Sequence, residues 1–334
     1  MGLASYLAKR AIERLILLLI FTAFVWMLVL GIPQLVGINP AYHFINPSEF
    51  LHSKNPELAE QLAIECIDRG LGLNYPLEVQ FFIYFIHMLT LNLGVCPVNH
   101  QSVAVCMLCA LPFTVILTIP PVLFQTLASI YLGSIAAIKR NTKIDVAIMS
   151  YFIVDYNLPI FVVTLFLWFL FAVVLKIYPI SVYNEVYDWT NIVTDLKVFW
   201  LPWLILTFIY GFSTRGILMR NAMVENLDSD FIKYERLAGL REKIVRAHAR
   251  RVSIIPVIVR TAIDLAFAIS GDFFIEVYFG IPGLGYKLFY AALGDEIMIV
   301  LGSTFVLTLY AIILLYFVDI VEFIIDPRAR RSVK

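Results

Sequence analysis

Six long apolar segments recur along this chain of 334 residues, and they limit its possible folds more than any other feature. A helix that crosses the hydrocarbon core of a bilayer needs about 20 mostly apolar residues. Segments of that length occupy residues 15–36, 107–138, 144–177, 198–217, 254–279 and 297–325. Only 15% of the residues are charged, whereas about a quarter are charged in soluble domains. The sequence therefore predicts an all-α integral membrane protein with six transmembrane helices.

Basic residues between the apolar segments predict the orientation of the helices. Lysines and arginines precede the first segment, lie between the second and third and between the fourth and fifth, and follow the sixth. With six crossings these four regions fall on one side, so both termini are expected in the cytoplasm. We expect residues 1–36 to form an N-terminal segment and the first transmembrane helix, residues 37–106 a long external loop region, and residues 107–334 a core with five transmembrane helices.

The sequence offers no catalytic constellation and no complete metal site. Cys106 and Cys109 have CxxC spacing but lack a second pair of ligands, while Cys66 and Cys96 share the external loop, where a disulfide is possible. The glycine-rich stretch 280–287 lacks the Gly-Lys-Ser/Thr ending of a phosphate-binding loop. The net charge of zero argues against a nucleic-acid partner. We therefore expect a chain in the lipid bilayer that is not an enzyme and holds no metal or cofactor of its own.

A highly charged stretch, residues 214–252, separates the fourth and fifth apolar segments. Residues 230–240 within it read as a short helix, with Asp230 as the candidate N-cap and Gly239 as the left-handed residue that ends it. Apolar residues stand among the charges at Phe231, Ile232, Tyr234 and Leu237. The positive-inside rule does not account for them, and such a mixture is typical of a docking surface. The segment 228–252 is thus predicted to bind another protein.

This stretch resembles the cytoplasmic coupling motif of ABC importer permeases, above all those of the oligopeptide, dipeptide and nickel family. The matching residues are 230–240, His248-Ala249-x-Arg251 and Pro256. Other segments resemble that family in the same order, namely 72–80 with 91–94, 133–140, Asn157-Leu158-Pro159, 276–285 and 326–328. The long loop after the first helix resembles the first of the family's two paired permease subunits.

The resemblance implies a permease subunit of an ATP-driven importer in the cell membrane. The implied substrate is an oligopeptide, with an oligosaccharide as the alternative. The implied partners are a second homologous permease, two ABC ATPase subunits that bind ATP and Mg²⁺, and an extracytoplasmic substrate-binding protein. The residues expected to couple this chain to the ATPases are Asp230, Phe231, Tyr234, Glu235, Arg236, Gly239 and Leu240.

Ionisable residues within or at the ends of the apolar segments form a second candidate site. They are Asp155, Arg260, Asp264, Asp272, Glu276, Asp319 and Glu322. Such residues usually face a bundle interior, a cavity or one another, and Arg260 and Asp264 have the i,i+4 spacing of a helical ion pair. We take Asp264 and Asp272 as candidates for a transport pathway. These acids leave open a stand-alone ion-coupled carrier or channel, and a structural membrane subunit is a further alternative.

Overall fold

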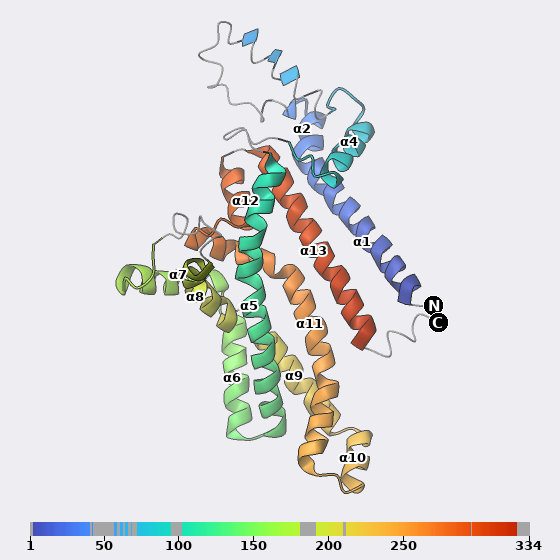
Figure 1. Cartoon of the computed structure of the whole chain (residues 1–334), viewed down its shortest axis with the longest axis vertical. Helices are drawn as coiled ribbons and strands as arrows, with labels where there is room; N and C mark the ends of the chain where they lie inside the picture. The colour runs from blue at the N-terminus through green and yellow to red at the C-terminus, as the bar shows by residue number, and fades with distance from the viewer. Residues whose placement is uncertain are drawn as a thin grey trace. The chain divides into compact units, whose positions relative to one another are not determined.

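The computed structural model describes residues 3–40, 72–94, 102–180, 192–209, 212–294 and 296–325, with a few single positions between 42 and 68. Every regular element within these ranges is a helix (Figure 1). The chain divides into two compact units. The first consists of Met1–Leu7, Phe113–Ile281 and Ile313–Lys334, and the second of Ala8–Pro112 and Pro282–Ile312. The predicted all-α class is confirmed for the described residues.

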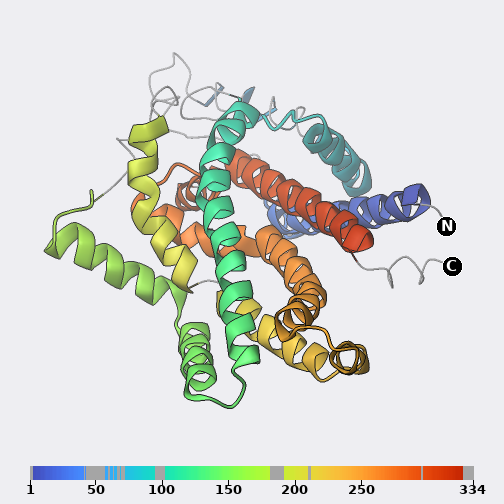
Figure 2. The same ribbon diagram turned by 60° about the horizontal axis from the view of Figure 1, so that its bottom comes forward.

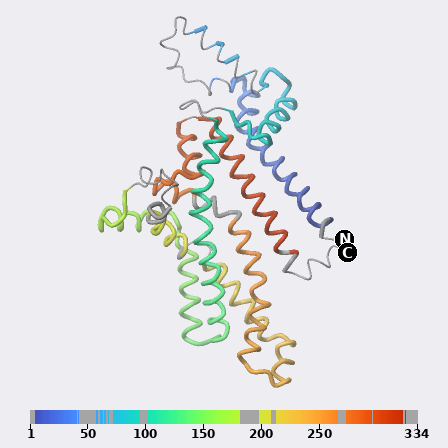
Figure 3. Tube along the Cα trace, in the orientation of Figure 1, coloured from blue at the N-terminus to red at the C-terminus, as the bar shows by residue number. Residues whose placement is uncertain are grey.

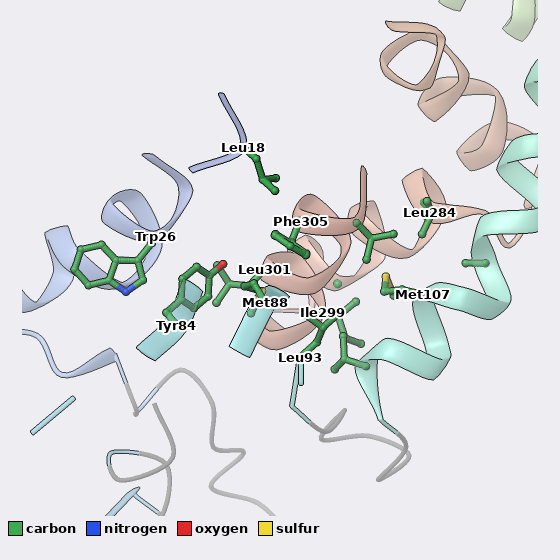
Figure 4. Packing of buried hydrophobic residues seen from close by; sticks show 14 of the residues in the cluster. Leu18, Trp26, Tyr84, Met88, Leu93, Met107, Leu284, Ile299, Leu301 and Phe305 are labelled. Atoms are coloured by element: carbon green, nitrogen blue, oxygen red, sulfur yellow. The ribbon is translucent and has the colours of Figure 1, made fainter. Parts of the chain in front are cut away.

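The second unit is built around one apolar core. Its elements are α1 (Leu3–Trp26), the π-helical η1 (Met27–Gly31), α2 (Ile32–Leu35), α4 (Leu77–Leu89), α12 (Leu284–Leu293) and the adjoining parts of α5 (Val103–Ile138) and α13 (Ile297–Ile325). Trp26, Tyr84 and Phe305 are buried in the core that these helices share (Figure 4). The side-chain amide of Gln34 donates to Gln80 Oε1 at 2.9 Å, so α2 and α4 are also joined by a polar contact.

The first unit holds the rest of α5 and α13 together with the helices of the middle of the chain. These are α6 (Lys143–Asn157), α7 (Ile160–Trp168), the π-helical η4 (Phe169–Val174), α8 (Ile192–Ile209), α9 (Phe212–Leu227), α10 (Asp230–Leu237) and α11 (Glu242–Phe279). A tight turn through Asn141 folds α6 back along α5 (Figure 1). Arg220 of α9 donates two hydrogen bonds of 2.8 Å to Asp145 of α6, and these bonds join the two helices.

The helix breaks at Asn157-Leu158-Pro159, where α6 and the α7–η4 helix meet at 90°. Leu158 is extended, with φ −79° and ψ 120°, as expected for a residue that precedes proline. Asn157 Nδ2 donates to the Ile153 carbonyl at 2.6 Å and so satisfies an acceptor in the last turn of α6. Figure 3 follows this turn along the chain trace.

The lengths and compositions of the helices account for several of the predicted crossings. Three described helical stretches are long and apolar enough to cross a membrane, namely Ser5–Leu35, Val103–Ile138 and Ile297–Val321. Two bent pairs, α6 with α7–η4 and α8 with α9, raise the number to as many as five if each pair forms one crossing. The remaining predicted segment, 254–279, lies within α11.

Helix α11 begins earlier than the sequence indicated. Pro256 was expected to open the fifth crossing, but it lies inside a single helix of 38 residues that starts at Glu242. Proline lacks the amide that an internal helical position normally donates, yet the helix continues through it to Phe279. As a result, the charged segment before Pro256 and the apolar segment after it are parts of one element.

Two glycines allow α5 and α9 to approach closely. A Cβ on Gly133 of α5 would lie 2.6 Å from the carbonyl oxygen of Gly216 on α9 and 2.8 Å from Cβ of Met219. A Cβ on Gly216 would in turn overlap the ring of Phe152 on α6. Three helices therefore meet where only glycine fits.

We expect Gly133→Val to lower the thermal stability of the purified chain, because the added methyl groups force α5 and α9 apart. Overpacking of this kind costs about 1–3 kcal/mol. Leu127→Val is the matched control, since it places the same residue on the same helix at an exposed position. Thermal unfolding in detergent measures both variants, and equal midpoints for the two would contradict the close approach.

Candidate functional site

Helix α10 is a short helix with well-defined ends. Its N-cap is Ser229, not Asp230 as predicted; Asp230 is the first helical residue and pairs with Lys233 Nζ at 2.9 Å. The expected left-handed residue is confirmed, since Gly239 has φ +79°. The amides of Gly239 and Leu240 donate to the carbonyls of Arg236 and Glu235, at 3.0 and 3.2 Å. This is the paired hydrogen-bond pattern of a Schellman motif, which turns the chain from α10 into α11.

One face of α10 is fixed to α11 by apolar packing. Ile232 is fully buried against Val245 and Ala249 of α11, with Leu227 at the end of α9 beside them. Figures 1 and 2 show α9, α10 and the first turns of α11 gathered in this region. Burial of a side chain the size of isoleucine is worth about 1.5–3 kcal/mol, so α10 is held in place and does not hang free as a loop.

Polar contacts reinforce the same junction. Glu235 Oε1 lies 2.8 Å from His248 Nδ1, and Arg236 makes two hydrogen bonds of 3.3 Å to Glu242. Glu235 and Arg236 are among the residues expected to couple this chain to a partner. The structure places both in contacts with α11 of their own chain.

The opposite face of α10 is apolar and exposed. Tyr234 and Leu237 are 71% and 82% exposed, and they are flanked by Phe231 and Leu240, which are 41% and 40% exposed. We call these four residues the α10 apolar face. Leu237 was absent from the residues expected to couple. Phe231, Tyr234 and Leu237 follow one another at intervals of three, however, and this spacing places them on the same side of a helix. Such an exposed apolar group is typical of a protein-binding surface.

A cluster of three charged residues, Arg236, Glu242 and Arg246, lies at the junction between α10 and α11. Glu242 accepts hydrogen bonds from Arg236 and also from Arg246, at 3.1 Å. These hydrogen bonds, with the nearby positive charges, hold the pKa of Glu242 below its ordinary value of 4.5. All three side chains are partly exposed, so the cluster orients the junction more than it stabilises the fold.

The second candidate site contains a buried arginine that the sequence analysis did not single out. Asp264 Oδ1 accepts from Arg260 Nε at 2.8 Å, and Asp264 Oδ2 lies 3.2 Å from Nε of Arg215. Arg215 is fully buried. It also donates to the Val122 carbonyl at 3.1 Å and to Thr126 Oγ1 at 2.9 Å. Its position inside the predicted segment 198–217, instead of after it, was the signal that this arginine is internal.

The other predicted ionisable residues lie in separate places. Glu276 is buried and accepts from Thr114 Oγ1 at 2.6 Å, and the hydroxyl of Ser213 donates to buried Asp155. Gly280 follows Glu276 with φ +69°, in agreement with the expected turn. Asp319 is buried. The side chains of Asp272 and Glu322, and residues Cys66 and Cys96, lie outside the described part of the chain.

We expect Ile232→Ala to loosen α10 from α11, because a buried isoleucine shortened to alanine typically costs about 2–5 kcal/mol. Limited trypsin cleavage at Lys233 and Arg236 should become several times faster, while Leu237→Ala, which shortens an exposed side chain of the same helix, leaves cleavage unchanged. Equal cleavage of both variants would show that Ile232 does not anchor the helix.

The titration of Glu242 should depend on its two arginines. Because its pKa is lowered, the cluster stabilises the junction above about pH 4.5 and is lost as the pH falls through the lowered value. In ¹³C-carboxyl NMR of selectively labelled protein, Arg236→Gln should raise the midpoint of Glu242. Arg250→Gln, an exposed change on the same helix, is the control. A midpoint unchanged by Arg236→Gln would rule out the cluster.

Comparisons with known proteins agree with this geometry. Residues 129–331, more than half of the chain and including α10 and α11, match the family described as binding-protein-dependent transport system inner membrane component. The chain is 28% identical over 281 residues to the dipeptide transport system permease protein DppB of Lactococcus lactis, covering 83% of this chain and 88% of that protein.

Two further relatives are similar over comparable lengths. The oligopeptide transport system permease protein OppB of Haemophilus influenzae is 28% identical, with 79% of this chain and 84% of that protein covered. The dipeptide transport system permease protein DppB of Bacillus subtilis is 29% identical, with 80% and 85% covered. These matches confirm the predicted family, and the chain belongs to the inner membrane components of binding-protein-dependent transport systems, as a multi-pass protein of the cell membrane.

Proposed function

We propose that this chain is one of two permease subunits of an ATP-driven peptide importer. In this proposal it crosses the membrane six times with both termini in the cytoplasm, and α10 lies on the cytoplasmic side. A second homologous permease completes the pathway. Two ABC ATPase subunits, which bind ATP and Mg²⁺, dock beneath the pair, and an external binding protein delivers the substrate.

The observation that carries this proposal is the α10 apolar face. Tyr234 and Leu237 expose large apolar surfaces, although the same short helix buries Ile232 completely. A helix held firmly on one side and apolar on the other suits a surface that must transmit force to a partner. Family membership supplies the class of partner, an ATPase.

The attachment of α10 to α11 suggests how the force travels. Ile232 packs near residue 245, and Asp264 lies 19 positions further along the same helix. At 1.5 Å per residue this is about 28 Å along α11. When the ATPases close on ATP, α10 moves with them, and α11 carries the displacement to the buried ion pairs around Asp264. The pathway then switches between its inward-facing and outward-facing forms.

The proposed substrate rests on the relatives. Three similar proteins are named as dipeptide or oligopeptide permeases, and we extend this class to the present chain in preference to an oligosaccharide. Asp264, one of the acids that left a stand-alone ion-coupled carrier open, is ion-paired with two arginines, and this favours the importer over such a carrier. A free carboxylate is what such a carrier would need there.

We expect the double substitution Tyr234→Ala with Leu237→Ala to detach the ATPases. Both side chains are exposed, so the thermal stability of the chain should change little. Removal of two central apolar contacts of an interface typically weakens binding by about tenfold or more. Co-purification of ATPase subunits from gently solubilised membranes and ATP-dependent uptake of a labelled tripeptide should fall together.

The matched control is Tyr131→Ala with Leu127→Ala, which removes the same two residue types from exposed positions on α5. This variant should retain its ATPases. If the α10 variant keeps both ATPases and uptake at the level of the parent chain, α10 is not the coupling element. If the parent chain purifies without any ATPase and still transports, the importer assignment fails.

A further inference from the structure

The charges at Asp264 of α11, which pairs with Arg215 of α9 and with Arg260 of its own helix, do not cancel. Asp264 carries one negative charge, and two guanidinium groups approach it, Arg215 at 3.2 Å and Arg260 at 2.8 Å. Each arginine takes a different oxygen of the same carboxylate. The three side chains together therefore hold two positive charges against one negative charge.

The two arginines differ in what surrounds them. Arg215 has no exposed surface, and Gln125, Thr126 and the Val122 carbonyl fill its hydrogen-bonding positions. Arg260 is 45% exposed, and within the described part of the chain only its Nε has a partner. Among the described residues, Asp264 is its single ionic partner, so its two terminal nitrogens remain available to an anion.

The direction of the Arg260 side chain is also informative. Side chains on a helix lean toward its N-terminus, and a long basic side chain near a membrane surface normally extends toward that surface. Arg260 is instead hydrogen-bonded to Asp264, a residue one turn further from the start of α11. Its guanidinium is thus held away from the basic start of α11, which our proposed orientation places at the cytoplasmic surface.

An exposed guanidinium at this depth is unfavourable against lipid, so it is expected to face protein or a water-filled route. Val252, Pro256 and Arg260 follow one another at intervals of four along α11, and all three are exposed. This face of α11 is therefore suited to line the pathway. Asp264, fixed by Arg215, holds the arginine in position there.

We propose that Arg260 is an anion-binding residue of the pathway and takes a carboxylate group of the passing substrate. Guanidinium and carboxylate groups form strong charge-assisted hydrogen bonds. The inference rests on the proposed importer function and deepens it, because peptides carry a carboxylate whereas neutral sugar oligomers do not.

The test compares three tripeptides in proteoliposomes that contain the whole transporter and its binding protein. The first has neutral side chains and a free C-terminus, the second is its C-terminal amide, and the third is an amide with one glutamate side chain. Arg260→Gln removes the charge but leaves the pair between Arg215 and Asp264. Loss of one charged hydrogen bond should reduce uptake of the free acid about tenfold or more. Uptake of the amide without glutamate, which has no carboxylate, should fall by less than about twofold.

The ratio of variant to parent uptake is taken for each peptide, so the preference of the binding protein cancels. Arg260→Lys should restore most of the free-acid uptake, and Arg250→Gln, at an exposed position ten residues earlier, should alter all three peptides equally. If Arg260→Gln also reduces uptake of the glutamate-containing amide, the site accepts side-chain carboxylates as well. If that uptake is unchanged, the site accepts only the C-terminal carboxylate. If Arg260→Gln reduces uptake of the free acid and of the amide without glutamate equally, the inference is overturned while the importer assignment stands.

A second measurement does not depend on uptake of the amide. In the assembled complex, Arg260→Cys should react with a sulfonated, water-soluble thiol reagent above the background of the parent chain. The free-acid tripeptide should slow that reaction during turnover. No reaction in any nucleotide state would mean that protein or lipid covers the side chain, and the inference would fail. If the parent complex transports no peptide in any form, the importer proposal and this inference fall together.

Discussion

The continuity of α11 is the constraint on which the rest of the first unit depends. This helix runs from Glu242 to Phe279 through Pro256, and separate contacts attach to it along its length. Ile232 packs on its first turns, buried Arg215 of α9 pairs with Asp264 further along, and Thr114 of α5 binds Glu276 near its end. In the proposed coupling, this single helix carries a displacement at one attachment to the others.

Buried polar groups determine which helices contact one another. Apolar packing alone discriminates weakly between helices in a bilayer, since the lipid is as apolar as the side chains. Arg220 with Asp145, Ser213 with Asp155, and the pairs around Asp264 are specific, because an unpaired charge in that setting is costly. The close approach at Gly133 and Gly216 adds a steric requirement that no side chain could meet. Together these contacts fix which faces of α5, α6, α9 and α11 are turned inward.

The sequence predicted the elements of the candidate sites better than their contacts. Helix α10, its end at Gly239 and the pairing of Arg260 with Asp264 all follow from local rules of spacing and backbone conformation. The sequence did not reveal that Glu235 and Arg236 turn toward His248 and Glu242, since both are as polar as residues that face water. Leu237 was left out of the coupling residues although its local spacing places it beside Tyr234, whereas the burial of Arg215 depends on residues far away in the chain.

The sequence by itself determined that the chain is helical, apolar enough for a membrane, and equipped with a short amphipathic helix within its most charged stretch. These properties come from composition and from periodicity over a few turns, which do not need a folded chain to be recognised. Only the tertiary structure decided which side of α10 is anchored, where Arg215 is buried, and that Arg260 keeps its two terminal nitrogens available while its Nε is bonded to Asp264. Such facts depend on long-range packing, because burial and charge pairing join residues as far apart as Gln125 and Arg215.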